Sequence, residues 1–294
     1  MKIQFTTSES LGDEIVFTAA VESIKKQKPD WQIAMKSNKP PVWANNPHLS
    51  PATPDFFDYP VKYPAINESN QRCITYLQAM LEHVAKSLDT QLYLTTNRGH
   101  IYLTEDEMKK YADMKPYWIV IPSGKKDYTC KLWSQDYYQQ VVNHFMGKVR
   151  FVQSVEKNGY GSGKLRNCVD YLVDIPIRDM FSLVYNAEGV VSHVTSWQHI
   201  AGAFQKPYVC IAGGREGAVW INSYPFQHTL HTVGSLPCCS HGGCWKARVQ
   251  ALNDNDKLDK NLCLKPMFYE GQWVPECLLK IKPRDVITTM ERIL

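Results

Sequence analysis

Five cysteines crowd the last quarter of this 294-residue chain and are the residues best suited to bind a metal. They are Cys238, Cys239, Cys244, Cys263 and Cys277. In a reducing compartment such clustering favours a metal over disulfides, and four thiolates suit tetrahedral zinc or iron. Four protein ligands would leave no open position for catalysis, so the predicted site is structural. The predicted ligands are Cys239, Cys244, Cys263 and Cys277.

The ligand set has alternatives. Cys238 could replace Cys239, and His241 is a further candidate. The Gly242-Gly243 turn would let the first pair of ligands converge. Buried free cysteines, which behave as small apolar residues, are the alternative to a metal.

A lysine-rich stretch at residues 124–133, GKKDYTCKLW, could bind a diphosphate group. It follows a predicted strand and contains three lysines together with Thr129. Lysines such as Lys131 attract phosphate as point charges, and the threonine hydroxyl can donate a hydrogen bond. A solvated basic surface loop is the alternative, because lysine is common on protein surfaces.

Leu11-Gly12-Asp13 is predicted to lie between a first strand and a first helix. A glycine at this point lets the backbone turn close to a ligand, and Asp13 would lie near the helix N-terminus and a cleft. The alternative is that Asp13 only caps the helix. Glu9 and Glu14 are nearby carboxylates that compete for any catalytic role.

Polar residues follow two apolar strands within residues 188–215. They are Ser192, His193 and Thr195 after the first strand and Gly213, Gly214 and Arg215 after the second. His199 lies one helical turn beyond Thr195, so both can face one side of a helix. Because ligands of open parallel sheets bind outside the carboxyl ends of the strands, we expect a ligand here. For His199, a packed histidine without a ligand is the alternative.

A βαβ unit must position these residues. Residues 189–191 and 207–212 are apolar without alternation, which predicts buried parallel strands, and residues 195–204 predict the connecting helix. The same rhythm restarts after residue 117, with strands at 118–122 and 149–153 and a helix at 135–145.

The first part of the chain shows a similar alternation. Strands are predicted at 2–6, 31–35 and 55–59, helices at 15–27 and 73–88, a loop at 60–70, and a capping box from Thr104 to Glu107. A break near residue 115 predicts two domains, 1–114 and 115–294, the second with a Cys-rich metal-binding segment at 238–277. The predicted fold class is α/β, with two Rossmann-like doubly wound domains that face a cleft.

Composition limits the classes of protein that the chain can be. It is 44% hydrophobic and 21% charged, as expected for a globular protein, and its net charge of +4 is too small to argue for nucleic-acid binding. The N-terminus lacks the pattern of a signal peptide, and no apolar run approaches the roughly 20 residues of a membrane span. A cytoplasmic location is therefore expected. The glycine-rich residues 158–164, NGYGSGK, predict a surface loop, because the hydroxyl residue that a P-loop needs does not follow Lys164.

Taken together, these motifs resemble glycosyltransferase family 9, which contains the ADP-heptose:lipopolysaccharide heptosyltransferases. Leu11-Gly12-Asp13 resembles the family's LGD opening, and Asn46-Pro47-His48 resembles its NPH turn. Lys131-Leu132-Trp133 is similar to the Lys-x-Trp end of its donor-phosphate loop. Residues 190–214, with His199-Ile200-Ala201-Gly202-Ala203, resemble its nucleotide-binding segment. The Cys-rich tail is similar to the iron-binding finger of the related protein heptosyltransferases.

The resemblance implies an inverting enzyme of the GT-B fold that moves a heptose or another sugar from a nucleotide-diphosphate donor to a hydroxyl. Asp13 would be the base, Lys131 and Thr129 would hold the diphosphate, and no catalytic metal is expected. Donor contacts would also come from Thr195, Ser196, His199, Gly213 and Gly214. One departure is Val194, which stands where the family has the aspartate of an Asp-Ser-Gly donor turn.

Several alternatives share parts of this pattern. The acceptor could be a glycan, a protein or, as in some phage enzymes of the same fold, a modified DNA base. The loss of a carboxylate at Val194 would also fit a non-catalytic module that binds a sugar nucleotide or a partner. A metal-dependent nucleic-acid protein is a further alternative, but few basic residues flank the cysteines beyond Lys246 and Arg248.

Overall fold

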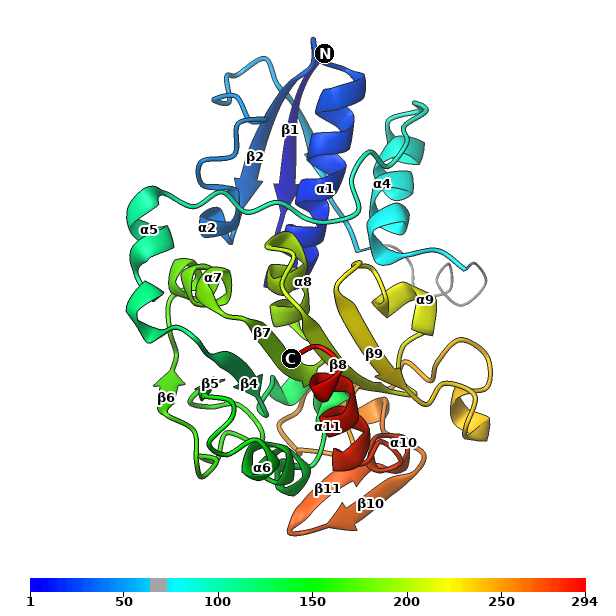
Figure 1. Cartoon of the computed structure of the whole chain (residues 1–294). Helices are drawn as coiled ribbons and strands as arrows, with labels where there is room; N and C mark the ends of the chain where they lie inside the picture. Colours follow the sequence, from blue (N-terminus) through cyan, green and yellow to red (C-terminus); the bar gives the residue numbers. More distant parts are fainter. Residues whose placement is uncertain (64–72) are drawn as a thin grey trace.

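The computed structural model describes residues 1–63 and 73–294 and contains two separate parallel sheets (Figure 1). The first sheet has the order β2-β1-β3. Its strands are β1 (Lys2–Thr7), β2 (Gln32–Ser37) and β3 (Phe57–Pro60). Most of the loop predicted at 60–70 lies outside the described residues.

The second sheet is larger and has the order β6-β5-β4-β7-β8-β9, with every neighbouring pair parallel. Its strands are β4 (Trp118–Ile121), β5 (Phe151–Val155), β6 (Asp170–Val173), β7 (Gly189–His193), β8 (Tyr208–Gly213) and β9 (Gln227–His231). Parallel strands joined by helices confirm the predicted α/β class with Rossmann-like sheets.

Helices fill the space between the sheets and cover the outer face of the second one (Figure 1). The first half of the chain contributes α1 (Leu11–Gln27), α2 (Pro40–Trp43), α4 (Tyr76–Ser87), α5 (Glu105–Lys109) and the 3-10 helix η1 (Ala112–Met114). Between the strands of the second sheet run η2 (Lys126–Lys131), α6 (Gln135–His144), α7 (Ile177–Asn186), α8 (Ser196–Ala203) and α9 (Ala218–Ile221).

The tail after β9 is built from short elements. They are η3 (Pro237–Cys239), η4 (Lys257–Lys260), the antiparallel hairpin of β10 (Pro266–Tyr269) and β11 (Gln272–Pro275), α10 (Glu276–Leu279) and α11 (Pro283–Glu291). In Figure 1 the hairpin lies at the end of the molecule farthest from the first sheet.

Alternate residues of the second sheet enter two different apolar cores, as expected for strands covered on both faces. Ile119 and Val190 pack with α8, α1 and the first sheet, so one core runs through both halves of the chain. Val120 and Val191 pack with α6 and α11 on the opposite face. The proposed domain bounds, 1–114 and 115–294, fall between η1 and β4 and remain a prediction.

The prediction erred on where helices begin and left out several elements, among them α2, α9, β9 and the hairpin and helices of the tail. α1 begins at Leu11, so Leu11-Gly12-Asp13 forms its first turn and is not a loop before the helix. β6 and α7 were absent from the prediction. The predicted capping box is confirmed: the Thr104 hydroxyl accepts from the Glu107 N–H (3.3 Å), and the Glu107 carboxylate accepts from the Thr104 N–H (2.8 Å).

Candidate active site and thiol cavity

A cleft of about 830 Å³ lies where the start of α1 faces the carboxyl ends of β4, β5 and β7. Five of the predicted site residues line it: Asp13, Lys131, Thr195, Ser196 and His199. They come from both halves of the chain, and their positions at strand ends follow the general rule for open parallel sheets.

Asp13 both caps α1 and faces the cleft, so the two predicted roles are compatible. One carboxylate oxygen, Oδ2, accepts hydrogen bonds from the hydroxyl of Ser10 (2.6 Å) and from its N–H (3.2 Å). The other, Oδ1, accepts from the Tyr76 hydroxyl (2.8 Å). The ring of Tyr76 stacks on Trp220 of the second half, with centroids 4.7 Å apart. These contacts fix the orientation of the carboxylate.

The two competing carboxylates differ in location. Glu9 lines the cleft, and burial, followed by the charge of Asp13, raises its pKa. Glu14 is buried away from the cleft, where it accepts hydrogen bonds from the Ser37 hydroxyl and from the indole N–H of Trp43. Glu14 therefore has a structural role, whereas Glu9 remains within reach of a ligand.

Gly12 allows α1 and α8 to approach each other closely. A Cβ placed on Gly12 would lie 2.7 Å from Cδ2 of His199 and 3.4 Å from the Cα of Ser196. The His199 ring cannot easily move, because it is half-buried and its Nδ1 is 2.6 Å from the Tyr224 hydroxyl. The glycine of this motif therefore makes room for a helix contact and the neighbouring aspartate faces the ligand space.

A cluster of three charges, Lys131, Arg215 and Glu216, forms one wall of the cleft. Lys131 Nζ lies 2.8 Å from Glu216 Oε1, and Arg215 binds the same oxygen. The Arg215 guanidinium also lies against the rings of Tyr128 and Trp245, with centroid distances of 5.1 and 5.7 Å. Two cations and one carboxylate leave one net positive charge beside the cleft, where a phosphate group could bind.

Burial and neighbouring charges set the protonation of this wall. Burial lowers the pKa of Lys131, while the Glu216 carboxylate opposes that shift. Burial by itself would raise the pKa of Glu216, but Lys131 and Arg215 outweigh it and the net pKa is lowered. Lys131 was predicted to hold the diphosphate, and Arg215 was predicted only as part of a turn near a ligand. The position of Arg215 and Glu216 directly after a strand was the available signal for the other two.

The N-terminus of α8 points polar groups into the cleft. Thr195 is the N-cap of α8, and Ser196 is its first helical residue. The Thr195 side chain makes no capping hydrogen bond to the first turn. Burial, then the charge of Lys131, lowers the pKa values of His193 and His199 to about 3, so both rings are neutral near pH 7. A helix N-terminus between neutral rings favours an anionic group.

Three residues predicted to contact the donor do not line the cleft. Thr129 is buried, and its hydroxyl accepts a hydrogen bond from the Val249 N–H (2.9 Å), which holds the tail against η2. A Cβ on Gly213 would lie 2.8 Å from the Leu278 side chain, and one on Gly214 would lie 2.8 Å from Cys239 Sγ. The glycine turn therefore packs against the tail on the side opposite the cleft.

Cysteines from four separate parts of the chain surround a second, closed space, here called the thiol cavity. Its volume is about 10 Å³, and the thiols that line it are those of Cys130, Cys238, Cys239, Cys244, Cys263 and Cys277. The predicted ligands are thus brought together, and Cys130 of η2 is an additional member that was not predicted. Its sequence distance from the tail concealed it.

The thiol cavity has the donor chemistry of a zinc or iron site but not a finished geometry. Among residues 1–63 and 73–294, no three Cys, His, Asp or Glu side chains are already arranged to hold a metal ion. The six thiols nevertheless fit a thiophilic metal, because such metals prefer sulfur ligands and the cavity has only about 10 Å³. His241 is exposed and does not line the cavity.

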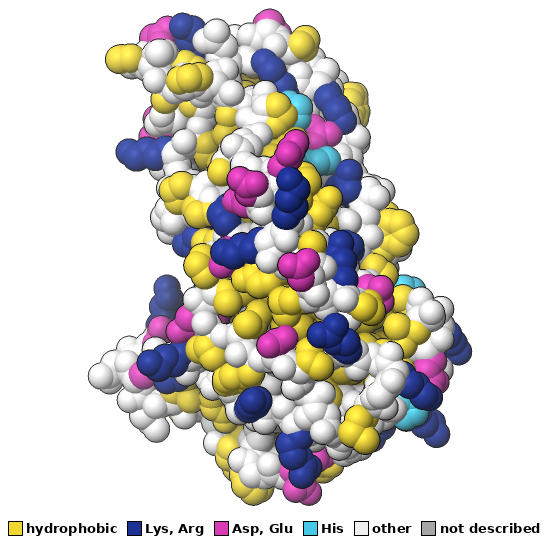
Figure 2. Space-filling model, turned by 60° about the vertical axis from the view of Figure 1, so that its left-hand side comes forward, with side chains coloured by type: hydrophobic (Ala, Val, Ile, Leu, Met, Phe, Trp, Pro, Cys, Tyr) yellow, Lys and Arg dark blue, Asp and Glu magenta, His cyan; other side chains and the backbone are white. Residues whose placement is uncertain are grey.

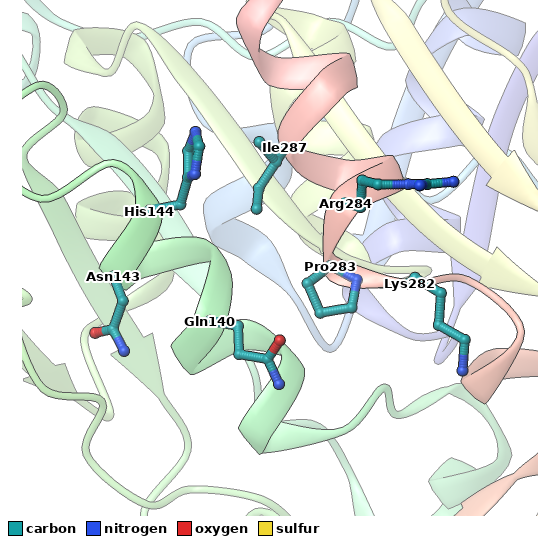
Figure 3. A pocket seen from close by; sticks show the side chains of 7 residues that line it. All are labelled: Gln140, Asn143, His144, Lys282, Pro283, Arg284 and Ile287. Atoms are coloured by element: carbon teal, nitrogen blue, oxygen red, sulfur yellow. The ribbon is translucent and has the colours of Figure 1, made fainter.

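Another hollow, of about 620 Å³, lies between α6 and α11 (Figure 3). Its lining includes His144 from α6 and Lys282 and Arg284 from α11. His144 Nε2 lies 2.9 Å from Glu291 Oε1. None of the predicted site residues lines this hollow, so it is separate from the cleft.

The sequence matches no protein-family profile and no curated protein sequence. Solved structures do match. ADP-heptose lipopolysaccharide heptosyltransferase II of E. coli aligns at a TM-score of 0.65 and 10% identity, over 100% of this chain and 98% of that chain. A glycosyl transferase family 9 protein from Veillonella parvula aligns at a TM-score of 0.69 and 13% identity, over 99% of this chain and 96% of that chain.

A third similar structure is the dodecameric iron-containing heptosyltransferase TibC of E. coli in complex with ADP-D-beta-D-heptose. It aligns at a TM-score of 0.65 and 14% identity, over 100% of this chain and 77% of that chain. Within the described part of this chain, no helix has the length and apolar character needed to cross a membrane. The chain has the GT-B fold of the glycosyltransferase family 9 heptosyltransferases.

Proposed function

We propose that this protein is an inverting glycosyltransferase that uses a nucleotide-diphosphate sugar and a hydroxyl acceptor. The observation that carries the proposal is the placement of Asp13 and Lys131 in one cleft, on opposite halves of the chain. A carboxylate base and a cation that faces it are the two groups that such a transfer requires.

Asp13 acts as the base in this proposal. The proton of the acceptor hydroxyl passes to a carboxylate oxygen of Asp13 while the acceptor oxygen forms a bond to the anomeric carbon of the donor. The bond from that carbon to the diphosphate oxygen breaks, and its electron pair leaves with the nucleoside diphosphate. Attack from the face opposite the leaving group inverts the anomeric configuration. Hydrogen bonds from Ser10 and Tyr76 hold the carboxylate in its orientation.

The second half of the chain stabilises the leaving group. Lys131 and Arg215 supply positive charge that Glu216 only partly neutralises. The N-terminus of α8 supplies a partial positive charge, which has the same sign. Charge that develops on the departing diphosphate is therefore met by groups already in place, which is where electrostatic catalysis has its largest effect.

We propose an adenine nucleotide as the first donor to test. Structures with this fold contain ADP or ADP-heptose, among them the E. coli heptosyltransferase WaaC with ADP, at a TM-score of 0.53 and 11% identity. The alignment covers 83% of this chain and 94% of the WaaC chain. Val194 lines the cleft at the place where the family has an aspartate, so the sugar itself need not be heptose.

The acceptor in this proposal is a hydroxyl of a glycan or a protein. A modified DNA base is a less favoured acceptor, because on the face in Figure 2 Lys and Arg side chains are interspersed with Asp and Glu. Duplex binding that weakens steeply with added salt would favour DNA instead.

We further propose that the thiol cavity holds a structural zinc or iron. The support is the convergence of six thiols and the iron content named for the similar TibC structure. The metal would tie the tail to the second sheet, and no step of the transfer passes through it. Elemental analysis of protein purified without added metal should find about one zinc or iron per chain. Metal-free, fully folded protein would refute this part of the proposal.

Thermal unfolding with a panel of nucleoside diphosphates and sugar nucleotides tests the donor proposal. A ligand of the folded state raises the melting temperature, and ADP is expected to do so more than UDP or GDP. Slow hydrolysis of the same sugar nucleotide without acceptor would distinguish an enzyme from a binding module. If no diphosphate nucleotide binds, the glycosyltransferase proposal is wrong.

A further inference from the structure

Three segments of the second half place neighbouring residues on opposite sides of one thin wall. In each, the first residue lines the thiol cavity and the second lines the cleft. The pairs are Cys130 and Lys131, Gly214 and Arg215, and Cys244 and Trp245. The charged wall of the cleft is therefore backed directly by cysteines.

Cys130 is bound firmly into this wall. Its side chain is 2% exposed, and its N–H donates to the carbonyl of Ala247 in the tail (3.0 Å). Its side chain and that of Cys263 line the same small cavity, so the two thiols are brought together although the residues are far apart in the chain. The cysteine next to Lys131 thus lies beside a predicted metal ligand.

Cys263, one of the predicted ligands, has the environment that a thiolate requires. The Lys265 N–H donates to Cys263 Sγ (3.4 Å). A bond of this kind orients a metal ligand and offsets its negative charge.

Cys239 has the opposite environment. Its sulfur points to the carbonyl oxygens of Leu236 (3.4 Å) and Thr232 (3.6 Å), to which it donates as a neutral thiol. A thiolate in that orientation would face two partial negative charges. Cys239 is therefore a poorer ligand than the sequence predicted. Cys130, a buried thiol beside Cys263, is the better candidate.

We propose that Cys130 completes the metal site with Cys244, Cys263 and Cys277, and that Cys239 is not a ligand. This inference rests on the proposed metal of the thiol cavity and changes its ligand set. Its consequence is that the metal ties η2 to the tail directly behind Lys131. Loss of the metal then loosens the wall that holds the donor diphosphate.

Single Cys→Ser variants test the ligand assignment. Metal content and the thiolate-to-cobalt absorption of cobalt-substituted protein are measured for Cys130→Ser, Cys239→Ser and Cys238→Ser. Cys73→Ser is the control, because Cys73 is exposed and does not line the cavity. We expect Cys130→Ser to lose most of its metal or its four-sulfur spectrum, and the other three to keep both. Full metal and an unchanged spectrum in Cys130→Ser would overturn the assignment, as would their loss in Cys239→Ser or Cys238→Ser alone.

ADP binding by calorimetry tests the consequence separately. Cys130→Ser should bind ADP several-fold more weakly than Cys239→Ser, and a chelator should weaken binding to the wild type to a similar degree. Equal ADP affinity in both variants would overturn the link between metal and donor wall. Failure of the metal-loaded wild type to bind ADP refutes the proposed function instead, and the cobalt spectra would still decide the ligands.

Discussion

The cleft and the thiol cavity share a wall but differ in size, access and chemistry. The cleft has about 830 Å³ and gathers charged and hydroxyl side chains from both halves of the chain. The thiol cavity has about 10 Å³ and is lined by six cysteines and other residues of the second half alone, among them Arg215, Lys265 and Glu276. A ligand that must enter and leave needs the first kind of space, whereas a permanent structural ion needs the second.

The wall that the two spaces share holds the charged residues of the cleft in fixed positions. Residues 213–216 make this plain, because the two glycines pack on the cysteine side while Arg215 and Glu216 face the cleft. The charged residues have little freedom, since the segment behind them is packed. Rigid placement of charge is what electrostatic stabilisation of a leaving group needs.

The largest expected effect is a loss of turnover that distinguishes Asp13 from Glu9, the two carboxylates compared as candidate bases. Asp13→Asn should lower turnover by roughly 10²–10⁴-fold, the usual contribution of a general base, and leave ADP affinity nearly unchanged. The metal content should not change, because Asp13 does not line the thiol cavity. Glu9→Gln is the matched variant and should retain most turnover. If Asp13→Asn remains active and Glu9→Gln does not, Glu9 is the base.

The next effect concerns the charged wall. Lys131→Met should weaken ADP binding by roughly 10–100-fold, because a charge-assisted hydrogen bond contributes about 1.5–3 kcal/mol. Lys126→Met is a matched control in the same loop, since Lys126 is exposed and lines neither space. Calorimetry with ADP measures both. Equal losses in the two variants would mean that only the general charge of the loop matters.

A pair of glycine variants probes the packing on each side of the wall. Gly12→Ala should lower the free energy of unfolding by about 1–3 kcal/mol, because the added methyl group meets the fixed ring of His199. Gly214→Ala should cost a similar amount, because the added methyl group would lie 2.8 Å from the sulfur and 3.2 Å from the Cβ of buried Cys239. Urea denaturation measures both. A Gly12→Ala protein as stable as the wild type would show that α1 and α8 can separate without cost.

The smallest expected effect is the contribution of His199, which lines the cleft, to the pH dependence of folding stability. His199 has a folded-state pKa of about 3, below the ordinary value of 6.5, so the unfolded chain binds its proton first on acidification. Stability conferred by the neutral ring is therefore present above pH 6.5 and is lost progressively as the pH falls toward 3. The stability difference between wild type and His199→Gln should shrink by about 1 kcal/mol from pH 6 to pH 5. Parallel pH curves of the two proteins would contradict the burial of a neutral His199.

Local patterns were enough to predict much of the fold. The apolar run before His193 and the one before Gly213 predicted neighbouring parallel strands, and β7 and β8 confirm them. The capping box at Thr104 was predicted because its bonds join residues three apart. β6 was not predicted, because its residues are half exposed at the sheet edge and lack a continuous apolar run.

Site residues were predictable where they lie in the segment that follows a strand, as Asp13, Lys131 and Thr195 do. The sequence cannot show to which side of a wall a residue points. Thr129 turns inward to Val249, although the preceding loop suggested a phosphate ligand. Gly213 and Gly214 face the tail for the same reason: their neighbours there are more than twenty residues away in the chain.

By itself the sequence determined the α/β class, four strands (β4, β5, β7 and β8) and two helices (α6 and α8) of the second half, and the presence of a thiol-rich tail. Those properties depend on periodicity and composition, which are local. Only the tertiary structure decided that Cys130 lies with the tail cysteines, that Glu216 pairs with Lys131, and that Gly12 leaves room for the His199 ring. Each of these is a contact between distant segments, and such contacts exist only after the sheets and helices have packed together.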